Sequence, residues 1–255
     1  FRRCYGVVKG RYSILQNEEA FEFMDTLVGP GNLLRYHTAG SLNGGRHVWL
    51  LAEVINLTIE PVKGDEVKVY LLLCNGHDGK MSLKVLFTTV RVVCANTFNL
   101  AIQTAKEGEK VSFRHSGDMM TKVKAAQKVL GFAKKEIKAY RDLTTSLAKK
   151  QIDVKSWDKF LDELIPLPKE GKGRRANQRD LLTELMESGP GTDIVGVRGS
   201  AWGALNAVTA YTSHLRTARG AGADSAAKRQ KRMESVWFGS GNAMNQKALG
   251  LLVGA

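Results

Sequence analysis

Three apolar runs decide the fold of this chain: HVWLLAEVI at 47–55, VKVYLLLC at 67–74 and SLKVLFTTVRVV at 82–93. They are rich in β-branched and large apolar residues, which favour strands. The turn-forming stretch LNGGR (42–46) precedes the first run, and NGHDG (75–79) separates the second from the third. We therefore expect a three-stranded antiparallel meander. Leu71 to Leu73 are apolar without alternation, which predicts a central strand covered on both faces.

The segments on either side of these runs are predicted to be helical. Asn96 is a typical helix N-cap, so we expect a helix through NTFNLAI at 96–102 directly after the third strand. Upstream, Asn17 is expected to cap a helix that ends at the Gly29-Pro30-Gly31 break.

From Gly117 onward the chain is predicted to be mainly helical. Apolar residues at steps of three and four from Met119 to Leu147 form one seam, which indicates a helix of about 30 residues. Further helices are expected over 153–164, 176–186, 200–214 and 226–252, the last with a break at 239–241. The fold class is therefore α+β, with a three-stranded antiparallel meander followed by a helix and a mainly helical C-terminal part. We expect two domains, an α+β core at 1–116 and a basic helical region at 117–255 packed on that core.

The composition is that of a basic globular protein. The 255 residues include 38 Lys and Arg against 25 Asp and Glu, for a formal net charge of +13. Most of this surplus follows Arg114, where 24 basic residues face 14 acidic ones. Such a surplus favours a polyanionic partner, with nucleic acid and an anionic membrane as the two usual kinds.

Cysteine usage and hydropathy predict the compartment. Cys4, Cys74 and Cys94 are an odd number without a close pair, which indicates reduced thiols rather than a disulfide framework. No run approaches the roughly 18 apolar residues that a membrane span needs. We therefore expect a cytoplasmic protein with no membrane partner.

Catalytic motifs are not found in the sequence. The five histidines lack metal-ligand spacing, and there is no Cys-x-x-Cys, His-Glu-x-x-His or Gly-x-Ser-x-Gly. His77-Asp78 could serve catalysis or a metal, but a turn-forming Asp beside an exposed His is the favoured interpretation. Gly44-Gly45 lacks the remainder of a phosphate-binding loop, so hairpin geometry is favoured there. We predict no catalytic residue, no metal site and no cofactor.

Basic residues are the candidate nucleic-acid contacts. One sector of the long helix, opposite its apolar seam, carries Lys124, Lys128, Lys135, Lys138 and Lys149. A solvated helix face is the alternative interpretation of this stripe. A second cluster is Arg174-Arg175, and a third, KRQKR at 228–232, is either a phosphate contact or a solvated helix end. In the meander, Arg46, Lys84 and Arg91 are candidate groove residues, because lysines and arginines in line can follow a phosphate backbone.

Aromatic residues in the meander have two interpretations. Trp49 and Phe87 could form a platform on which bases stack. Strand aromatics more often belong to the core, and we favour the core for both.

Five segments resemble a phage and plasmid protein family of unknown function: RYSILQNEEAFEF (11–23), GSLNGGRHVWLLA (40–52), NGHDG (75–79), VRVVCANTFNL (90–100) and WGALNAVTAY (202–211). The resemblance covers nearly the whole chain. It implies an origin on a mobile element and an additional N-terminal segment, consistent with a sequence that starts at Phe1 rather than Met. It implies no catalytic residue.

The expected order of three antiparallel strands and a helix is also similar to the core of single-strand annealing recombinases such as RecT and Red-beta. That similarity implies a ring or filament of subunits that holds single-stranded DNA in a basic groove and pairs it with a complement, without nucleotide hydrolysis. Our leading hypothesis is therefore a homo-oligomeric, ATP-independent annealing protein. A phage exonuclease or a host single-strand binding protein is a further expected partner.

Two other classes of function stay open. One is a protein-interaction or host-takeover module that binds an acidic host protein. The other is a metal-dependent DNA-processing enzyme.

Overall fold

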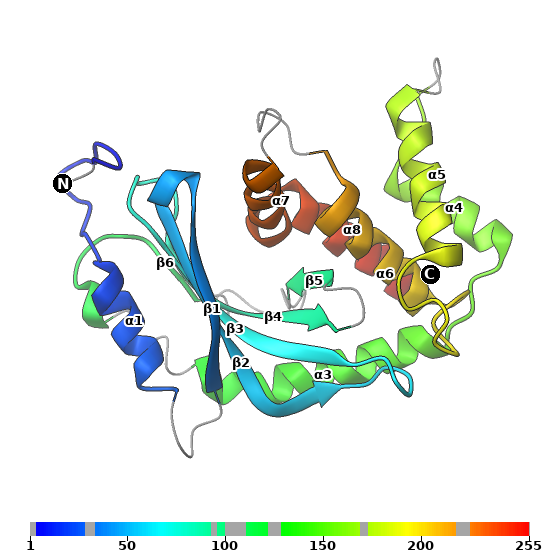
Figure 1. Ribbon diagram of the computed structural model, residues 1–255, viewed down its shortest axis with the longest axis horizontal. Coiled ribbons are helices and arrows are strands. Elements are labelled where there is room, and N and C mark those ends of the chain that lie inside the picture. Colours follow the sequence, from blue (N-terminus) through cyan, green and yellow to red (C-terminus); the bar gives the residue numbers. More distant parts are fainter. Residues whose placement is uncertain are drawn as a thin grey trace. The chain divides into compact units, whose positions relative to one another are not determined.

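The computed structural model describes residues 4–28, 34–92, 96–99, 111–121, 129–168, 173–217 and 225–254. It is a mixture of strands in the first half and helices in the second, which confirms the α+β class (Figure 1). The chain forms two compact units. The first comprises Phe1–Leu57, Lys68–Thr88 and Leu100–Lys138, and the second comprises Thr58–Val67, Thr89–Asn99 and Ala139–Ala255. The division at residue 116 stays a prediction.

The sheet is wider than the expected three strands. Six strands belong to it: β1 (Leu34–Leu42), β2 (His47–Ile59), β3 (Val67–Gly76), β4 (Leu83–Arg91), β5 (Asn96–Asn99) and β6 (Val111–Phe113). The order is β1-β2-β3-β4-β5, and β6 pairs with β4. Strands β2, β3 and β4 are the three runs that the sequence predicts, and they occupy the middle of the sheet.

Strand β1 has no alternating pattern that would predict it. Residues 35–39 are all exposed, so neither face of the strand carries an apolar row. It is held instead by antiparallel pairing with β2, in which Leu42 lies opposite His47 and Gly40 opposite Trp49. The register shifts between Tyr36 and Thr38, where the strand bulges. Turn η1 (Asn43–Gly45) joins the two strands, and all three of its residues have positive φ.

The helix predicted from Asn96 is wrong over its first four residues. Residues 96–99 form β5 next to β4, and the remainder of the predicted helix, 100–102, lies outside the described residues. The local signal of an N-cap Asn is compatible with several conformations, and pairing with β4 decides between them. Strand β6 was likewise not predicted.

The core of the first unit is formed by the central strands. Leu71, Leu72 and Leu73 of β3 are fully buried, which confirms a strand covered on both faces. Trp49 and Phe87 are also buried, as favoured, and are not a surface platform. Helix α1 (Asn17–Asp25) starts one residue earlier than predicted, with Gln16 as its N-cap.

The helical part agrees closely with prediction. Residues 119–121 are helical, and 122–128 lie outside the described residues. Helix α3 (Val129–Lys149) has its seam buried at Ile137, Tyr140, Thr144 and Leu147. The other helices are α4 (Val154–Leu164), α5 (Gly173–Ser188), α6 (Ala201–Ala210), η2 (Tyr211–Leu215), α7 (Ser225–Phe238) and α8 (Ser240–Gly254). Within the described ranges, none of these helices is long and apolar enough to cross a membrane.

Helix α6 is the centre of the second unit. All ten of its residues are buried, and it packs against α5 and α8. Gly203 lets the loop before α6 pack directly on the helix, because a Cβ there would lie 2.2 Å from the Val197 carbonyl oxygen. Helices α4 and α7 pack on α8 in turn (Figure 1).

The pairing of Gly40 with Trp49 gives a test of the β1–β2 register. A Cβ on Gly40 would lie 2.7 Å from Cζ2 of the indole, so we expect Gly40→Ala to lower the free energy of unfolding by about 1–3 kcal/mol. Urea unfolding measures this. Gly10→Ala is the control, because a Cβ there meets no described atom within 4 Å. Equal stabilities for the two variants would contradict the register.

Candidate functional site

Four segments of the first unit meet at one end of the sheet. The N-terminal segment, turn η1, the β3–β4 turn and the residues after β6 come together there (Figure 1). The His77 amide donates to the Arg46 carbonyl at 2.8 Å, and the Tyr12 hydroxyl donates to the Gly76 carbonyl at 2.7 Å. The Ser13 amide donates to the His115 carbonyl at 3.0 Å. These hydrogen bonds, two between backbone groups and one from the Tyr12 side chain, therefore fix the relative positions of all four segments.

A buried His–Asp pair lies beneath this end. His47 Nε2 is 3.1 Å from Asp78 Oδ1, and each side chain is only 7% exposed. The other ring nitrogen of His47, Nδ1, lies 3.1 Å from the side-chain nitrogen Nδ2 of Asn43. Because both ring nitrogens of His47 are engaged, the ring positions Asp78 and turn η1 rather than presenting a base to a substrate.

The Asp78 carboxylate is kept ionised. Burial acts to raise its pKa, but hydrogen bonds from the Lys80 amide and from His47 outweigh burial and hold the pKa below its usual value. The Lys80 amide donates to Asp78 Oδ1 at 3.0 Å. The one carboxylate of the β3–β4 turn is therefore turned inward and satisfied within the protein.

Two histidines stack on tyrosines at the same end. His77 stacks with Tyr5 at 5.9 Å between ring centroids, and its Nε2 is 2.6 Å from Asn17 Oδ1. Burial, with a contribution from His47, lowers the pKa of His77. His115 stacks with Tyr12 at 4.8 Å, and burial with the nearby Asp78 charge raises the pKa of Tyr12. The rings of Tyr5 and Tyr12 are half-buried and reach the surface.

Exposed cations surround these rings. We call this set the basic turn end, and it comprises Lys9, Arg11, Arg46, Lys80 and Arg114. The sequence predicted only Arg46 among them. The others were missed because they are spread along the sequence between residues 9 and 114. They become neighbours only when the four segments meet. Their one sequence signal was that Arg11 and Arg46 lie within segments carrying the family resemblance.

The remaining predicted contacts are dispersed. Lys84 is half-buried on β4 opposite Ser112, and burial lowers its pKa. Lys138 is exposed on α3, and Arg174 and Arg175 are exposed at the start of α5 in the second unit. Arg175 Nη1 donates to the Pro166 carbonyl at 2.7 Å. Outside the described residues lie Lys124, Lys128 and the side chain of Lys135.

Arg91 lies inside the second unit and is a structural residue there. Its side chain is 3% exposed, and Nε donates to Asp65 Oδ1 at 2.6 Å. The second Asp65 oxygen accepts from Trp202 Nε1 at 2.7 Å. Arg91 Nη1 donates to the Pro190 carbonyl at 2.9 Å. A guanidinium held in this way is a poor candidate for a phosphate contact.

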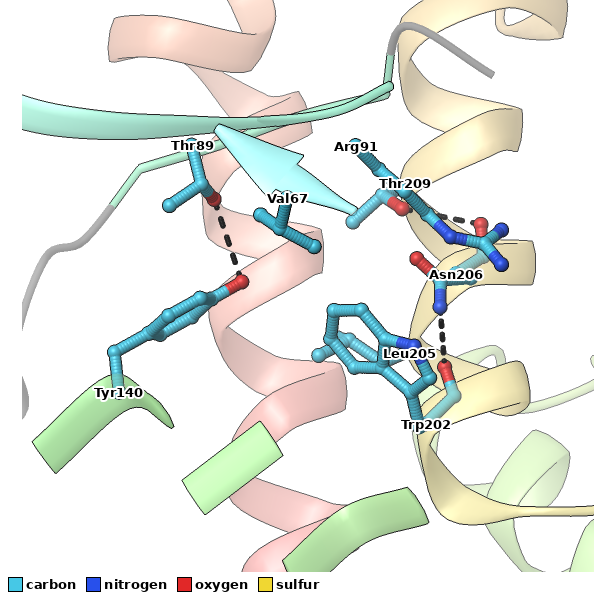
Figure 2. A pocket seen from close by; sticks show the side chains of 8 residues that line it. All are labelled: Val67, Thr89, Arg91, Tyr140, Trp202, Leu205, Asn206 and Thr209. Atoms are coloured by element: carbon cyan, nitrogen blue, oxygen red, sulfur yellow. Dashed lines mark hydrogen bonds between the residues drawn. The ribbon is translucent and has the colours of Figure 1, made fainter. Parts of the chain in front are cut away.

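A small cavity adjoins Arg91. It measures about 10 Å³, and Thr89, Tyr140, Trp202 and Asn206 help to line it (Figure 2). The Tyr140 and Thr89 hydroxyls are 3.3 Å apart, and burial raises the pKa of Tyr140 to about 12. A space of this size is comparable to one water-sized sphere, so it is a packing defect rather than a ligand pocket.

The described residues show no candidate metal site. Among the described residues, no three His, Cys, Asp or Glu side chains are grouped as a metal ion requires.

Comparison with protein families identifies the chain. The family described as Domain of unknown function (DUF932) matches residues 4–237, which is most of its length. The chain belongs to the DUF932 family. No significant match was found among curated proteins or among solved structures, so the similarity to RecT and Red-beta has no support from these comparisons.

The segments that carry the family resemblance are divided between the two units of this DUF932 domain. Those at 11–23, 40–52 and 75–79 supply Arg11 and Arg46 of the basic turn end and the His47–Asp78 pair of the first unit. Those at 90–100 and 202–211 supply Arg91 and Trp202 to the buried cluster of the second.

The buried ion pair predicts a large effect of a small substitution. Asp65→Asn leaves the Arg91 charge buried without its counter-charge, so we expect the free energy of unfolding to fall by about 3–5 kcal/mol. Chemical denaturation measures this. Glu187→Gln, which alters the exposed Arg198–Glu187 pair in the same way, should cost about 1 kcal/mol or less. A similar loss in both variants would show that burial of the pair is unimportant.

The lowered pKa of His77 predicts a pH dependence. The unfolded chain takes up the proton near the ordinary value of 6.5, whereas the folded chain resists it, so stability falls as the pH drops through that value toward the lower folded pKa. We expect the wild type to lose more stability than His77→Gln between about pH 7.5 and about pH 5.5. Urea midpoints across this range test it, and parallel pH profiles would refute it.

Proposed function

We propose that this protein binds single-stranded nucleic acid through the basic turn end and brings complementary strands together without nucleotide hydrolysis. The observation that carries the proposal is the combination at one end of the first unit of five exposed cations with two half-buried tyrosine rings.

Charge supports the nucleic-acid partner. The cations of the basic turn end project from four segments, whereas Asp78 is paired with His47 and turned inward. Ionic attraction from such a surface is independent of base sequence and weakens steeply with salt. The formal net charge of +13 adds long-range attraction to a polyanion.

Ring stacking supports a single strand over a duplex. Unpaired bases present their faces to aromatic side chains, and stacking on such rings is tolerant of sequence. Tyr5 and Tyr12 are the candidates, each already backed by a histidine ring. In the annealing activity we propose, the bound strand keeps its bases accessible for pairing.

The proposed annealing activity suits a protein of DNA recombination. We infer a role in recombination on a phage or plasmid, with the protein acting as a homo-oligomer. A phage exonuclease or a host single-strand binding protein is the expected companion.

An annealing and binding assay tests the proposal. Labelled complementary oligonucleotides are mixed with purified protein, without nucleotide, over a series of salt concentrations. We expect Arg46→Gln to weaken binding to every sequence and to lower the slope of log affinity against log salt by about 0.7, the loss of one phosphate contact with a single strand. Arg198→Gln, an exposed arginine of the second unit, is the matched control and should leave the slope unchanged.

The outcomes separate the parts of the proposal. Faster pairing than in protein-free solution supports annealing. Tight binding without faster pairing would restrict the protein to strand binding, and no binding at low salt would reject the nucleic-acid partner.

An acidic protein is the second candidate partner, because apolar side chains stand exposed beside the cations. Val7 is 96% exposed and Ile14 is 62% exposed, close in sequence to Lys9 and Arg11. Protein interfaces combine apolar and charged contacts in this way. Binding that survives high salt and is lost in Ile14→Ser, with no shift of oligonucleotides, would favour this candidate.

A further inference from the structure

A π-helical turn follows the central helix of the second unit. Helix α6 continues at Tyr211 into η2, five residues of π-helix, and the chain leaves the helix at Arg216. Helices α7 and α8 both pack against η2 and against each other. Such π-turns are rare and occur often at functional sites, because the extra residue displaces side chains from the regular helical positions.

Hydrogen-bonding atoms without partners collect on these three elements. Several buried side-chain atoms there make no hydrogen bond within the described part of the chain, and among them are Ser213 Oγ, Arg216 Nη1, Arg232 Nε, Asn242 Oδ1 and Asn245 Nδ2. We call these residues the π-turn cluster. Buried polar atoms are nearly always satisfied in proteins, so a concentration of exceptions marks a place where a water, an ion or a ligand can bind.

Helical spacing places the members of the cluster on facing surfaces. The Thr212 hydroxyl lies 2.9 Å from Asn245 Oδ1 and 3.1 Å from the Thr209 carbonyl oxygen, and the first contact joins η2 to α8. The Asn245 amino group makes no hydrogen bond in the described part of the chain. Arg216 follows Thr212 by one turn, and Asn242 precedes Asn245 by one turn. On α7, Arg232 precedes the buried Val236 by one turn, on the side that packs inward.

The cluster combines a buried base with a partly open rim. Asn245 is 1% exposed, whereas Ser213, Arg216, Arg232 and Asn242 are partly exposed. The cluster therefore combines one buried amide with four side chains that solvent partly reaches.

We propose that the π-turn cluster binds a phosphate group. Two guanidinium groups, a carboxamide NH₂ and a hydroxyl are donors, and the arginines supply positive charge that matches an oxyanion. Donors from three elements suit the tetrahedral arrangement of phosphate oxygens better than the planar pair of a carboxylate. Asn242 Oδ1 accepts from the P–OH of a singly protonated phosphate.

The surrounding charge has the same sign. Helix α7 carries Lys228, Arg229 and Lys231 besides Arg232, with Glu234 as its one acidic residue. These residues form the third basic cluster of the sequence, KRQKR at 228–232. The sequence alone is compatible with a phosphate contact or a solvated helix end there. The site belongs to the second unit, whereas the basic turn end belongs to the first.

Calorimetry with inorganic phosphate tests the site on the full chain. We expect saturable binding and a rise in melting temperature, with acetate at the same ionic strength producing neither. Arg232→Gln and Asn245→Asp should each weaken phosphate binding at least tenfold. Asn245→Asp keeps the acceptor for Thr212 and replaces the donor with a repelling charge.

Arg229→Gln is the matched control, because it removes the same charge from an exposed position on the same helix. It should change phosphate affinity less than twofold. Circular dichroism verifies the fold of each variant, and Arg216→Gln replaces Asn245→Asp if that protein does not fold.

Two results would overturn the proposal, and competition experiments identify the source of the phosphate. Phosphate binding no stronger than acetate binding overturns it, and so does an equal loss in Arg229→Gln and Arg232→Gln. Competition by an oligonucleotide would identify the phosphate as that of a nucleic-acid backbone, and its failure would identify a free phosphate or a small phosphate ester. Phosphate binding by a protein that binds no oligonucleotide would retain this site while rejecting the proposed function.

Discussion

The second unit depends on the charge of one buried carboxylate. Asp65 is fully buried, and its two oxygens accept from Arg91 and Trp202, which lie 26 and 137 residues away in the chain. Arg91 then reaches the carbonyl of Pro190 and lies so close to Gly191 that a Cβ there would be 2.6 Å from Nη2. An unpaired charge is too costly to bury. The segment before β3 that carries Asp65, the end of β4 that carries Arg91, helix α6 and the 189–191 turn must therefore assemble together.

In the first unit the cations of the basic turn end are exposed, whereas in the second unit Arg91 is buried. The His47–Asp78 pair and the tyrosine–histidine stacks satisfy one another inside, and these cations stay exposed. Internal pairing of Asp78 keeps that acid from opposing the neighbouring cations. A rigid basic surface loses little conformational entropy when it meets an anion, which favours binding.

Sequence patterns predicted the elements whose signals are local. Helix α4 was recognised from its amphipathic pattern, and its apolar face is buried in the structure. The unbroken leucines identified β3 as a central strand. Strand β1 was missed because its exposed residues lack any period, and β5 was mistaken for a helix because pairing with β4 overrides a cap signal. The basic turn end and the Arg91–Asp65 pair join distant segments, and no local pattern reports such contacts.

Strand β1 lies at the end of the strand order, where one row of backbone groups faces away from the sheet. Flat edges of this kind invite unrelated chains to add strands and grow into fibrils. The bulge between Tyr36 and Thr38 interrupts the repeat of those groups, and Arg35 places a charge beside it. The irregularity that concealed this strand from sequence patterns therefore also guards the protein against aggregation.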